Sequence, residues 1–199
     1  MSLVELIAQA DERGLAASGL ACLDRCVPLL GGDDEVLRPL WGHLTQEPGG
    51  GDWGELLAQV RGRLPEAAGP GADADQAVLL ARRMLAAAPA DRDAAGIRVW
   101  ADACSVAALR IHRLLDPAGD TGQADASPDG LDSVRAGRAP ATGRADGMSP
   151  LVAAELRRQV TVLELLAEHG TGGLRRALDV STEGRRVLRA VVSRRARNA

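Results

Sequence analysis

Reactive side chains gather in one stretch near the middle of the chain, over positions 100–116. Asp102, Ser105 and His112 are the residue types of a hydrolytic triad, and their spacing places them on one face of a helix. On a continuous helix, however, Ser105 and His112 are seven residues apart, which is roughly 10 Å along the axis. A nucleophile and its base must approach to about 3 Å. We therefore interpret this face as an ordinary polar stripe, with Cys104 as a small core residue.

Cysteine and histidine residues raise the question of a metal site. Cys22 and Cys26 are four residues apart, so both thiols face the same side of a predicted helix. Structural zinc sites normally carry two matched pairs of ligands, and the sequence offers no second pair. A metal or small-molecule site near Cys104 and His112 is kept as a further alternative. Free cysteines on apolar helix faces are common, and no motif calls for a cofactor, so we expect none.

The C-terminal end of the chain is basic. Eight Arg and two acidic residues from 175 to 199 give this end a net charge of +6, so residues 1–174 carry −9 of a total of −3. A basic helix over 175–197 would neutralise phosphates of a nucleic acid. The candidate contacts are Arg185, Arg186, Arg189, Arg194 and Arg195. No aromatic residues interleave with them for base stacking, so nucleic-acid binding is the alternative hypothesis and not the leading one.

Composition limits the class of protein. The 199 residues include no Phe or Tyr and three Trp, and the apolar residues are mostly Ala, Leu and Val, which suits helices better than strands. This length predicts one domain. Three Cys is an odd number, which argues against a disulfide scaffold. The N-terminal residues lack the pattern of a signal peptide, and no apolar run reaches about 18 residues. We expect a cytoplasmic protein that does not span a membrane.

Helix signals recur along the chain. Ser2 and Glu5 have the spacing of a capping box, and Ser149 stands directly before a proline that is favoured in a first helical turn. Pro28 and Pro39 fall inside helical patterns and should kink or end their helices. The predicted helices span about 2–13, 15–30, 33–46, 52–64, 73–88, 91–116, 150–169 and 173–195.

Apolar spacing supports the longer helices. The predicted apolar stripe of 91–116 is Ile97, Ala101, Cys104, Ala108, Ile111 and Leu115. The predicted stripe of 150–169 is Val152, Leu156, Val160, Leu163 and Ala167. In the last helix the pattern is interrupted near the sequence "STEG" at 181–184, where we expect a break.

The segment 117–148 differs from the rest of the chain. It contains six Gly and three Pro without a sustained apolar period, and it is too long for an ordinary loop inside a domain. We expect a mobile or irregular insertion with a short helix around 129–136. The predicted fold is therefore all-α. Residues 1–199 form one compact bundle of about seven or eight helices, with kinked early helices and this long Gly/Pro-rich excursion.

Two short islands resemble the YjaG-like family of bacterial helical proteins, which has no established activity. The first is "LACLDRCVP" at 20–28, similar to the family's Cys-Glu-Arg-x-x-Pro segment but with Leu23 and Asp24 in place of Cys and Glu. The second is "DAC" at 102–104 followed by His112, similar to the family's Asp-Ala-Cys…His pattern. The resemblance covers about half of the chain. It implies a compact all-helical domain and no particular reaction.

Asp24, Arg25, Asp102 and His112 belong to these two islands and predict a buried polar network between two helices. Such networks fix helix register when every member is satisfied, and we prefer this structural interpretation over a binding pocket. The leading functional hypothesis is a non-enzymatic protein that acts through protein contacts, in a regulatory or accessory role, on an unidentified protein partner. The sequence leaves a homodimer open.

Overall fold

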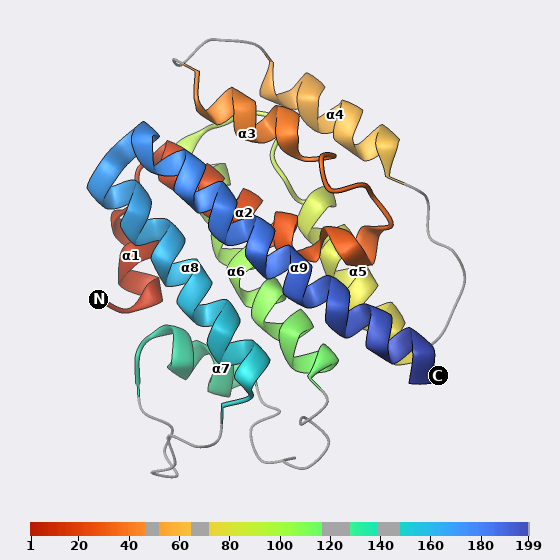
Figure 1. The fold of residues 1–199 in the computed structure, drawn as a ribbon. Coiled ribbons are helices and arrows are strands. Elements are labelled where there is room, and N and C mark those ends of the chain that lie inside the picture. Colours follow the sequence, from red (N-terminus) through yellow and green to blue (C-terminus); the bar gives the residue numbers. More distant parts are fainter. Residues whose placement is uncertain (47–51, 65–71, 117–127, 139–147, 199) are drawn as a thin grey trace.

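The computed structural model describes all residues except 47–51, 65–71, 117–127, 139–147 and 199. The α-helices in chain order are α1 (Leu3–Gln9), α2 (Glu12–Leu30), α3 (Arg38–Leu44), α4 (Trp53–Arg63), α5 (Ala72–Ala86), α6 (Ala94–Leu115), α7 (Pro128–Arg135), α8 (Pro150–His169) and α9 (Leu174–Asn198). A 3-10 turn, η4 (Gly170–Gly173), joins the last two. The described residues contain no strand, and the helices form a compact bundle (Figure 1), so the predicted all-α class is confirmed.

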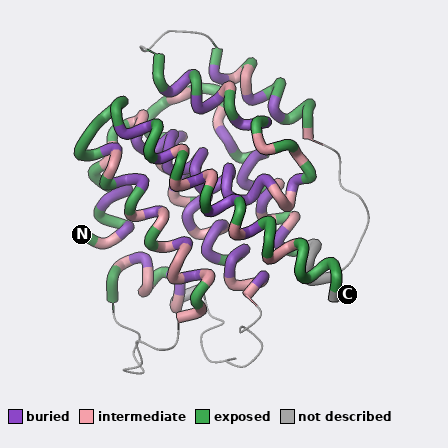
Figure 2. The backbone as a smooth tube through the Cα atoms, in the orientation of Figure 1, coloured by how far each residue is buried: buried purple, intermediate pink, exposed green. Residues whose placement is uncertain are grey.

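Helix α2 is the centre of the bundle. It packs against α6 and α9, and also contacts α3, α5 and α8, and most of its residues are buried (Figure 2). Gly19 allows α6 to approach closely, because a Cβ at this position would lie 2.7 Å from a ring atom of Trp100. The Trp100 indole N–H then donates to the carbonyl of Met84 at 2.8 Å, which ties α6 to α5.

Side-chain caps fix several helix starts. Ser2 and Glu5 form the predicted capping box, with the Ser2 Oγ accepting from the Glu5 N–H and the Glu5 carboxylate accepting from the Ser2 N–H. Ser149 caps α8 as predicted, because its Oγ accepts from the Val152 N–H at 3.3 Å. The predicted first helix, 2–13, is too long. Asp11 instead caps α2 by accepting from the Gly14 N–H at 2.7 Å, so α1 ends at Gln9.

The structure corrects two predicted helix interruptions, at Pro39 and at 181–184. Pro28 lies inside α2 as predicted. Pro39 instead lies in the first turn of α3, where its missing N–H has no helical partner to lose. The predicted break at 181–184 is absent, since α9 is continuous from Leu174 to Asn198. Within that stretch the Ser181 Oγ donates to the Ala177 carbonyl at 2.8 Å, so this buried hydroxyl is satisfied inside the helix.

The predicted insertion 117–148 contains one described helix. Helix α7 spans Pro128–Arg135, close to the expected 129–136, and contacts α6. Residues 117–127 and 139–147, on which the rest of this prediction falls, lie outside the described residues. None of the helices that the structure describes is long and apolar enough to cross a membrane.

The buried stripe of α6 is the predicted one, but that of α8 is not. All six predicted residues of α6 are buried. In α8, three residues of the predicted stripe are exposed or half-buried, namely Leu156, Val160 and Ala167. The residues that α8 buries are Val152, Glu155, Gln159, Val162, Leu163 and Leu166. The helix therefore turns two polar side chains, Glu155 and Gln159, toward the core.

Candidate functional site

The triad residues of α6 do not meet one another. The Ser105 hydroxyl donates to Oε1 of Gln159 at 2.6 Å and accepts from Nε of Arg135 at 3.1 Å. His112 instead contacts its own helix, with Nδ1 2.8 Å from the carbonyl of Ala108. Since α6 is continuous from Ala94 to Leu115, the hydroxyl and the imidazole stay apart as the spacing predicts.

An ion pair between α2 and α8 lies at the centre of the buried polar residues. Arg25 donates from Nε and Nη2 to the two carboxylate oxygens of Glu155, at 2.7 and 2.6 Å, and both side chains are 0% exposed. Burial acts to raise the pKa of Glu155, but the Arg25 guanidinium, His112 and the hydrogen bond from Gln159 together outweigh burial and hold the pKa below its usual value. Glu155 is therefore a carboxylate inside the core, bound in the bidentate geometry that favours Arg over Lys.

His112 faces this ion pair as a neutral side chain. Because a carbonyl oxygen only accepts, the Ala108 contact places the proton on Nδ1 of His112. Burial lowers the pKa of His112, and the nearby Glu155 opposes this shift only in part. With Nδ1 protonated and the ring neutral, Nε2 carries a lone pair and lies 3.5 Å from Oε2 of Glu155. Two acceptors do not bond, which agrees with the lack of a hydrogen-bond partner for this nitrogen among the described residues.

The same cluster continues from α8 to α6 and α7. The Gln159 amide donates to Glu155 at 2.8 Å and accepts from Ser105, so it joins the ion pair to α6. Arg135 of α7 then bridges Ser105 and Asp102 through Nε and Nη2. We call this group the Glu155 cluster, and its members are Arg25, Asp102, Ser105, His112, Arg135, Glu155 and Gln159.

Asp24 belongs to a second group, between α2 and α9. Its Oδ1 accepts from Nη1 of Arg185 at 2.5 Å, and the same Nη1 lies 2.7 Å from the Asp34 carbonyl oxygen. Arg189, one turn further along α9, donates to the Asp34 carboxylate at 2.8 Å. We call these four residues the Asp24 cluster. Burial raises the pKa of Asp24 to about 6, and Arg185 limits this increase.

The predicted network residues are thus divided. Arg25 and His112 both face Glu155, and Asp102 reaches them through Arg135, Ser105 and Gln159. Asp24 contacts neither Asp102 nor His112 through any hydrogen bond in the described part of the chain; it binds α9. Sequence reasoning missed Glu155, the residue that joins the others. A signal was present, because Glu155 and Gln159 are spaced by four residues within an apolar helix.

The cysteines are core residues. Cys22, Cys26 and Cys104 are each 0% exposed. Burial raises the pKa of the Cys22 thiol to about 12 and raises those of Cys26 and Cys104 well above their usual value. In the described ranges, no three His, Cys, Asp or Glu side chains lie together as a metal site requires. A ligand at Cys104 and His112 would have to reach side chains that are 0% and 1% exposed.

The predicted nucleic-acid contacts of α9 differ in exposure. Arg185 is 6% exposed and bound to aspartates, so the structure removes it from the exposed basic surface. Arg189 is half exposed and pairs with Asp34, and Arg195 donates to the Leu114 carbonyl at the end of α6. Arg186 and Arg194 are exposed.

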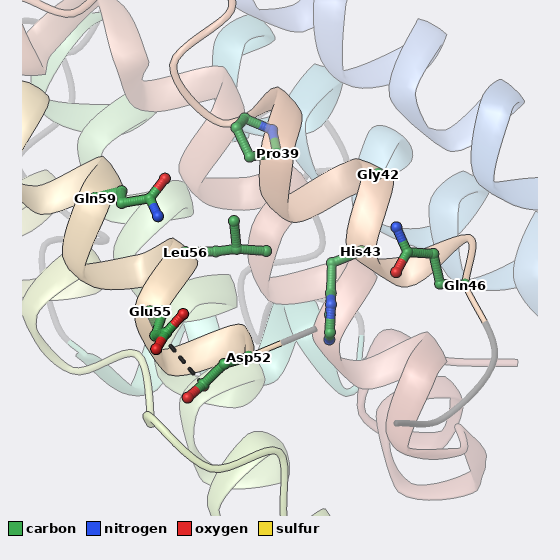
Figure 3. A pocket seen from close by; sticks show the side chains of 8 residues that line it. All are labelled: Pro39, Gly42, His43, Gln46, Asp52, Glu55, Leu56 and Gln59. Carbon is green, nitrogen blue, oxygen red and sulfur yellow. Dashed lines mark hydrogen bonds between the residues drawn. The ribbon is translucent and has the colours of Figure 1, made fainter. Parts of the chain in front are cut away.

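A surface depression lies between α3 and α4, and we call it the α3–α4 groove. Another, of about 430 Å³, is lined by His169, Gly172 and Arg176. The α3–α4 groove has a volume of about 470 Å³ (Figure 3). Its residues from α3 and just after it are Pro39, Gly42, His43 and Gln46, and those from α4 and its cap are Asp52, Glu55, Leu56 and Gln59. The groove therefore combines carboxylate, amide and imidazole groups with one Leu, at the surface of the bundle.

Comparison of the chain with known protein families, curated proteins and solved structures found no match. The resemblance to the YjaG-like family stays a prediction.

Proposed function

We propose that this protein is a non-enzymatic helical domain that acts through contacts with another protein, in a regulatory or accessory role. The observation that carries the proposal is the use of the reactive side chains. Ser105, His112 and Glu155 are at most 1% exposed, and each faces a partner from a neighbouring helix or its own backbone. Groups held in this way specify helix register, whereas a catalytic group must meet a substrate.

The α3–α4 groove is the surface that we assign to the contact. Its side chains are supported from below by buried apolar residues of both helices, including Trp41 and Leu44 on α3 and Leu57 on α4. Trp53 fixes the start of α4 further, because its indole N–H donates to the Pro89 carbonyl at 2.9 Å. A groove between two anchored helices offers a preformed shape, which reduces the ordering cost of binding a partner.

Affinity capture tests this proposal. The purified protein is immobilised and exposed to a lysate of the source organism, with and without nuclease, beside a resin that carries an unrelated helical protein. We expect a specific protein on the first resin under both conditions, and an equimolar complex when the two purified proteins are mixed and sized by chromatography. Recovery of no specific protein, or loss of every specific protein on nuclease treatment, contradicts the proposal.

The exposed arginines of α9 keep nucleic-acid binding as the second candidate. Arg186 and Arg194 are exposed and are not held by the Asp24 cluster. Truncation of α9 is an unsuitable test, because it would remove Leu188 and Arg185 from the core. Arg186→Ala with Arg194→Ala is the better variant. If the protein binds duplex DNA, the double variant should bind it less tightly and with a weaker dependence on salt.

A further inference from the structure

The two carboxylate side chains that line the α3–α4 groove, Asp52 and Glu55, are not balanced by a lining Arg or Lys. Glu55 projects from the first turn of α4 and Asp52 caps that helix (Figure 3), and none of the eight lining residues is Arg or Lys. Asp52 uses Oδ1 to accept from the N–H groups of Gly54 and Glu55, whereas the Glu55 carboxylate accepts no hydrogen bond from the described residues. No cation of the described residues forms an ion pair with Glu55. Arg13 donates to the backbone carbonyl of Gln46 at 3.3 Å, so its guanidinium lies at the rim of the groove without pairing with Glu55.

Two amides lie on opposite walls of the same groove. Gln46 follows α3 and Gln59 lies on α4 (Figure 3). Within the described ranges, neither side-chain amide takes part in a hydrogen bond, although each has donors and an acceptor. An extended peptide backbone presents both N–H and C=O groups, so such amides can bind it whatever its side chains are.

The groove is also open along its α3 wall. A Cβ built on Gly42 would meet no atom within 4 Å, so this position leaves space at the surface that a ligand can occupy. Leu56 supplies an apolar patch on the opposite wall, and the His43 ring is held against Trp53 with centroids 5.7 Å apart. The His43 ring is thus held in place, and no described residue fills the space beside Gly42.

We infer that the α3–α4 groove binds an extended segment of a protein partner that carries Arg or Lys side chains. The basic side chain pairs with Glu55, the backbone of the segment bonds to Gln46 and Gln59, and a neighbouring apolar side chain covers Leu56. This inference rests on the proposed function, because it names the chemistry of the partner at the surface assigned there.

Two glycines provide matched variants for the test. Gly42 lines the groove, whereas Gly62, near the C-terminal end of α4, is not among the residues that line it, and a Cβ at either position would meet no atom within 4 Å. Gly42→Gln fills the groove, whereas Gly62→Gln adds the same side chain to open space. Both variants should remain folded, with the melting temperature of the wild type or a slightly higher one, since Gln favours a helix over Gly.

Defined peptide pools serve as the probes. One pool of fluorescein-labelled nonapeptides carries two fixed Arg among random neutral residues, and the other carries two fixed Glu. We expect fluorescence anisotropy to show binding of the Arg pool only. Gly42→Gln should weaken this binding by about tenfold or more, and Gly62→Gln should leave it unchanged. Glu55→Gln should weaken it by about fivefold at low salt and by less at high salt.

The outcomes separate this inference from the proposed function. Equal binding of the two pools, no binding of the Arg pool at millimolar peptide, or equal binding by both glycine variants overturns the inference. A partner captured from the lysate that still binds Gly42→Gln would leave the proposed function standing on another surface. Binding of the Arg pool at the groove without any captured protein would contradict the proposed function alone.

Discussion

At the scale of single residues, the stability of the core depends on a buried ion pair between Arg25 and Glu155. Arg25 is fully buried, and Glu155 supplies its only carboxylate contact in the described part of the chain. Two buried ions are costly to remove from water, and the bidentate geometry offsets that cost only while both partners are present. His112 can remain beside them because it is neutral. These residues therefore stabilise the fold only together, and the loss of one should leave the others buried without a partner.

Replacement of Glu155 by Gln should destabilise the protein strongly. The variant keeps the shape of the side chain but leaves the Arg25 charge buried without a counter-ion, so we expect the free energy of unfolding to fall by about 3–5 kcal/mol. Glu164→Gln on the exposed side of the same helix is the control and should change it by less than about 0.5 kcal/mol. Urea denaturation measures both. A loss for Glu155→Gln no larger than that of the control would show that the ion pair contributes nothing.

Asp24 should make stability depend on pH in the direction opposite to an ordinary paired carboxylate. Its pKa is about 6 in the folded protein, above the ordinary value of 3.8, because burial opposes its charge. As the pH falls from 7 to 4, the folded state binds this proton first, so Asp24 contributes up to about 3 kcal/mol of added stability. Asp24→Asn lacks this titration. The difference in unfolding free energy between wild type and variant should therefore shift in favour of the wild type as the pH falls.

The comparison of wild type with Asp24→Asn removes the effects of the other titrating groups on stability. The lowered pKa of His112 costs stability as the pH falls below about 6.5, and the lowered pKa of Glu155 costs stability below about 4.5. Both groups are present in wild type and in Asp24→Asn, so their effects drop out of the difference. A difference that is constant between pH 7 and pH 4 would mean that Asp24 keeps its ordinary pKa. Asp24→Ala, which removes the buried carboxylate that accepts from Arg185, should lower the melting temperature at pH 7.

At the scale of helices, the apolar periodicity of the sequence predicts the buried face of a helix correctly where that face is apolar, and it fails where polar residues are buried. The α6 stripe is correct because all six of its residues are apolar or small. The α8 stripe is displaced because Glu155 and Gln159 carry polar side chains that a hydrophobic pattern places outside. Their partners, Arg25 and Ser105, are 130 and 54 residues away in sequence. No local rule connects such positions, so the spacing of Glu155 and Gln159 could indicate two polar residues on one face of α8 but not the residues that they contact.

The uninterrupted course of α9 has a related cause. Gly184 predicts a weak point in a helix, but here it provides room for another side chain. A Cβ at Gly184 would lie 2.3 Å from Cδ of Arg25 and 3.0 Å from Cδ of Arg158. The glycine lets the stem of Arg25 pass beneath α9 on its way to Glu155. The feature that looked like a break is therefore a packing requirement of the Glu155 cluster.

Replacement of Gly184 by Ala should destabilise the protein, whereas Gly→Ala in a helix usually stabilises it. In an open helical position, Gly→Ala stabilises a protein by up to about 1 kcal/mol, and Gly62→Ala should do so because its Cβ would meet no atom within 4 Å. Gly184→Ala should instead lower the unfolding free energy by about 2 kcal/mol or more, since Arg25 cannot move without breaking its ion pair. Thermal and urea unfolding measure both. Stabilisation by Gly184→Ala would show that α9 is free to shift away from Arg25.

At the scale of the whole molecule, α2 joins the parts of the bundle. It carries Arg25 of the Glu155 cluster and Asp24 of the Asp24 cluster, at adjacent positions. The first residue holds α8 and the second holds α9, and α6 packs on another side of the same helix through Gly19. Separation of α2 from its neighbours would therefore break both clusters and expose the core together, which predicts cooperative unfolding.

The three cysteines report on this cooperativity. Cys22 and Cys26 lie on α2 and Cys104 lies on α6, all 0% exposed, and burial holds the pKa of the Cys22 thiol near 12. A thiol reagent can reach them only when the helices separate, so in the native state we expect all three thiols to react at one slow rate. Under conditions where the helices close faster than the reagent reacts, that rate gives an opening free energy, which should equal the unfolding free energy from urea. In concentrated denaturant all three should react at the rate of a free thiol. Rapid labelling of one cysteine in the absence of denaturant would show that its helix opens alone and that α2 does not join the bundle into a single cooperative unit.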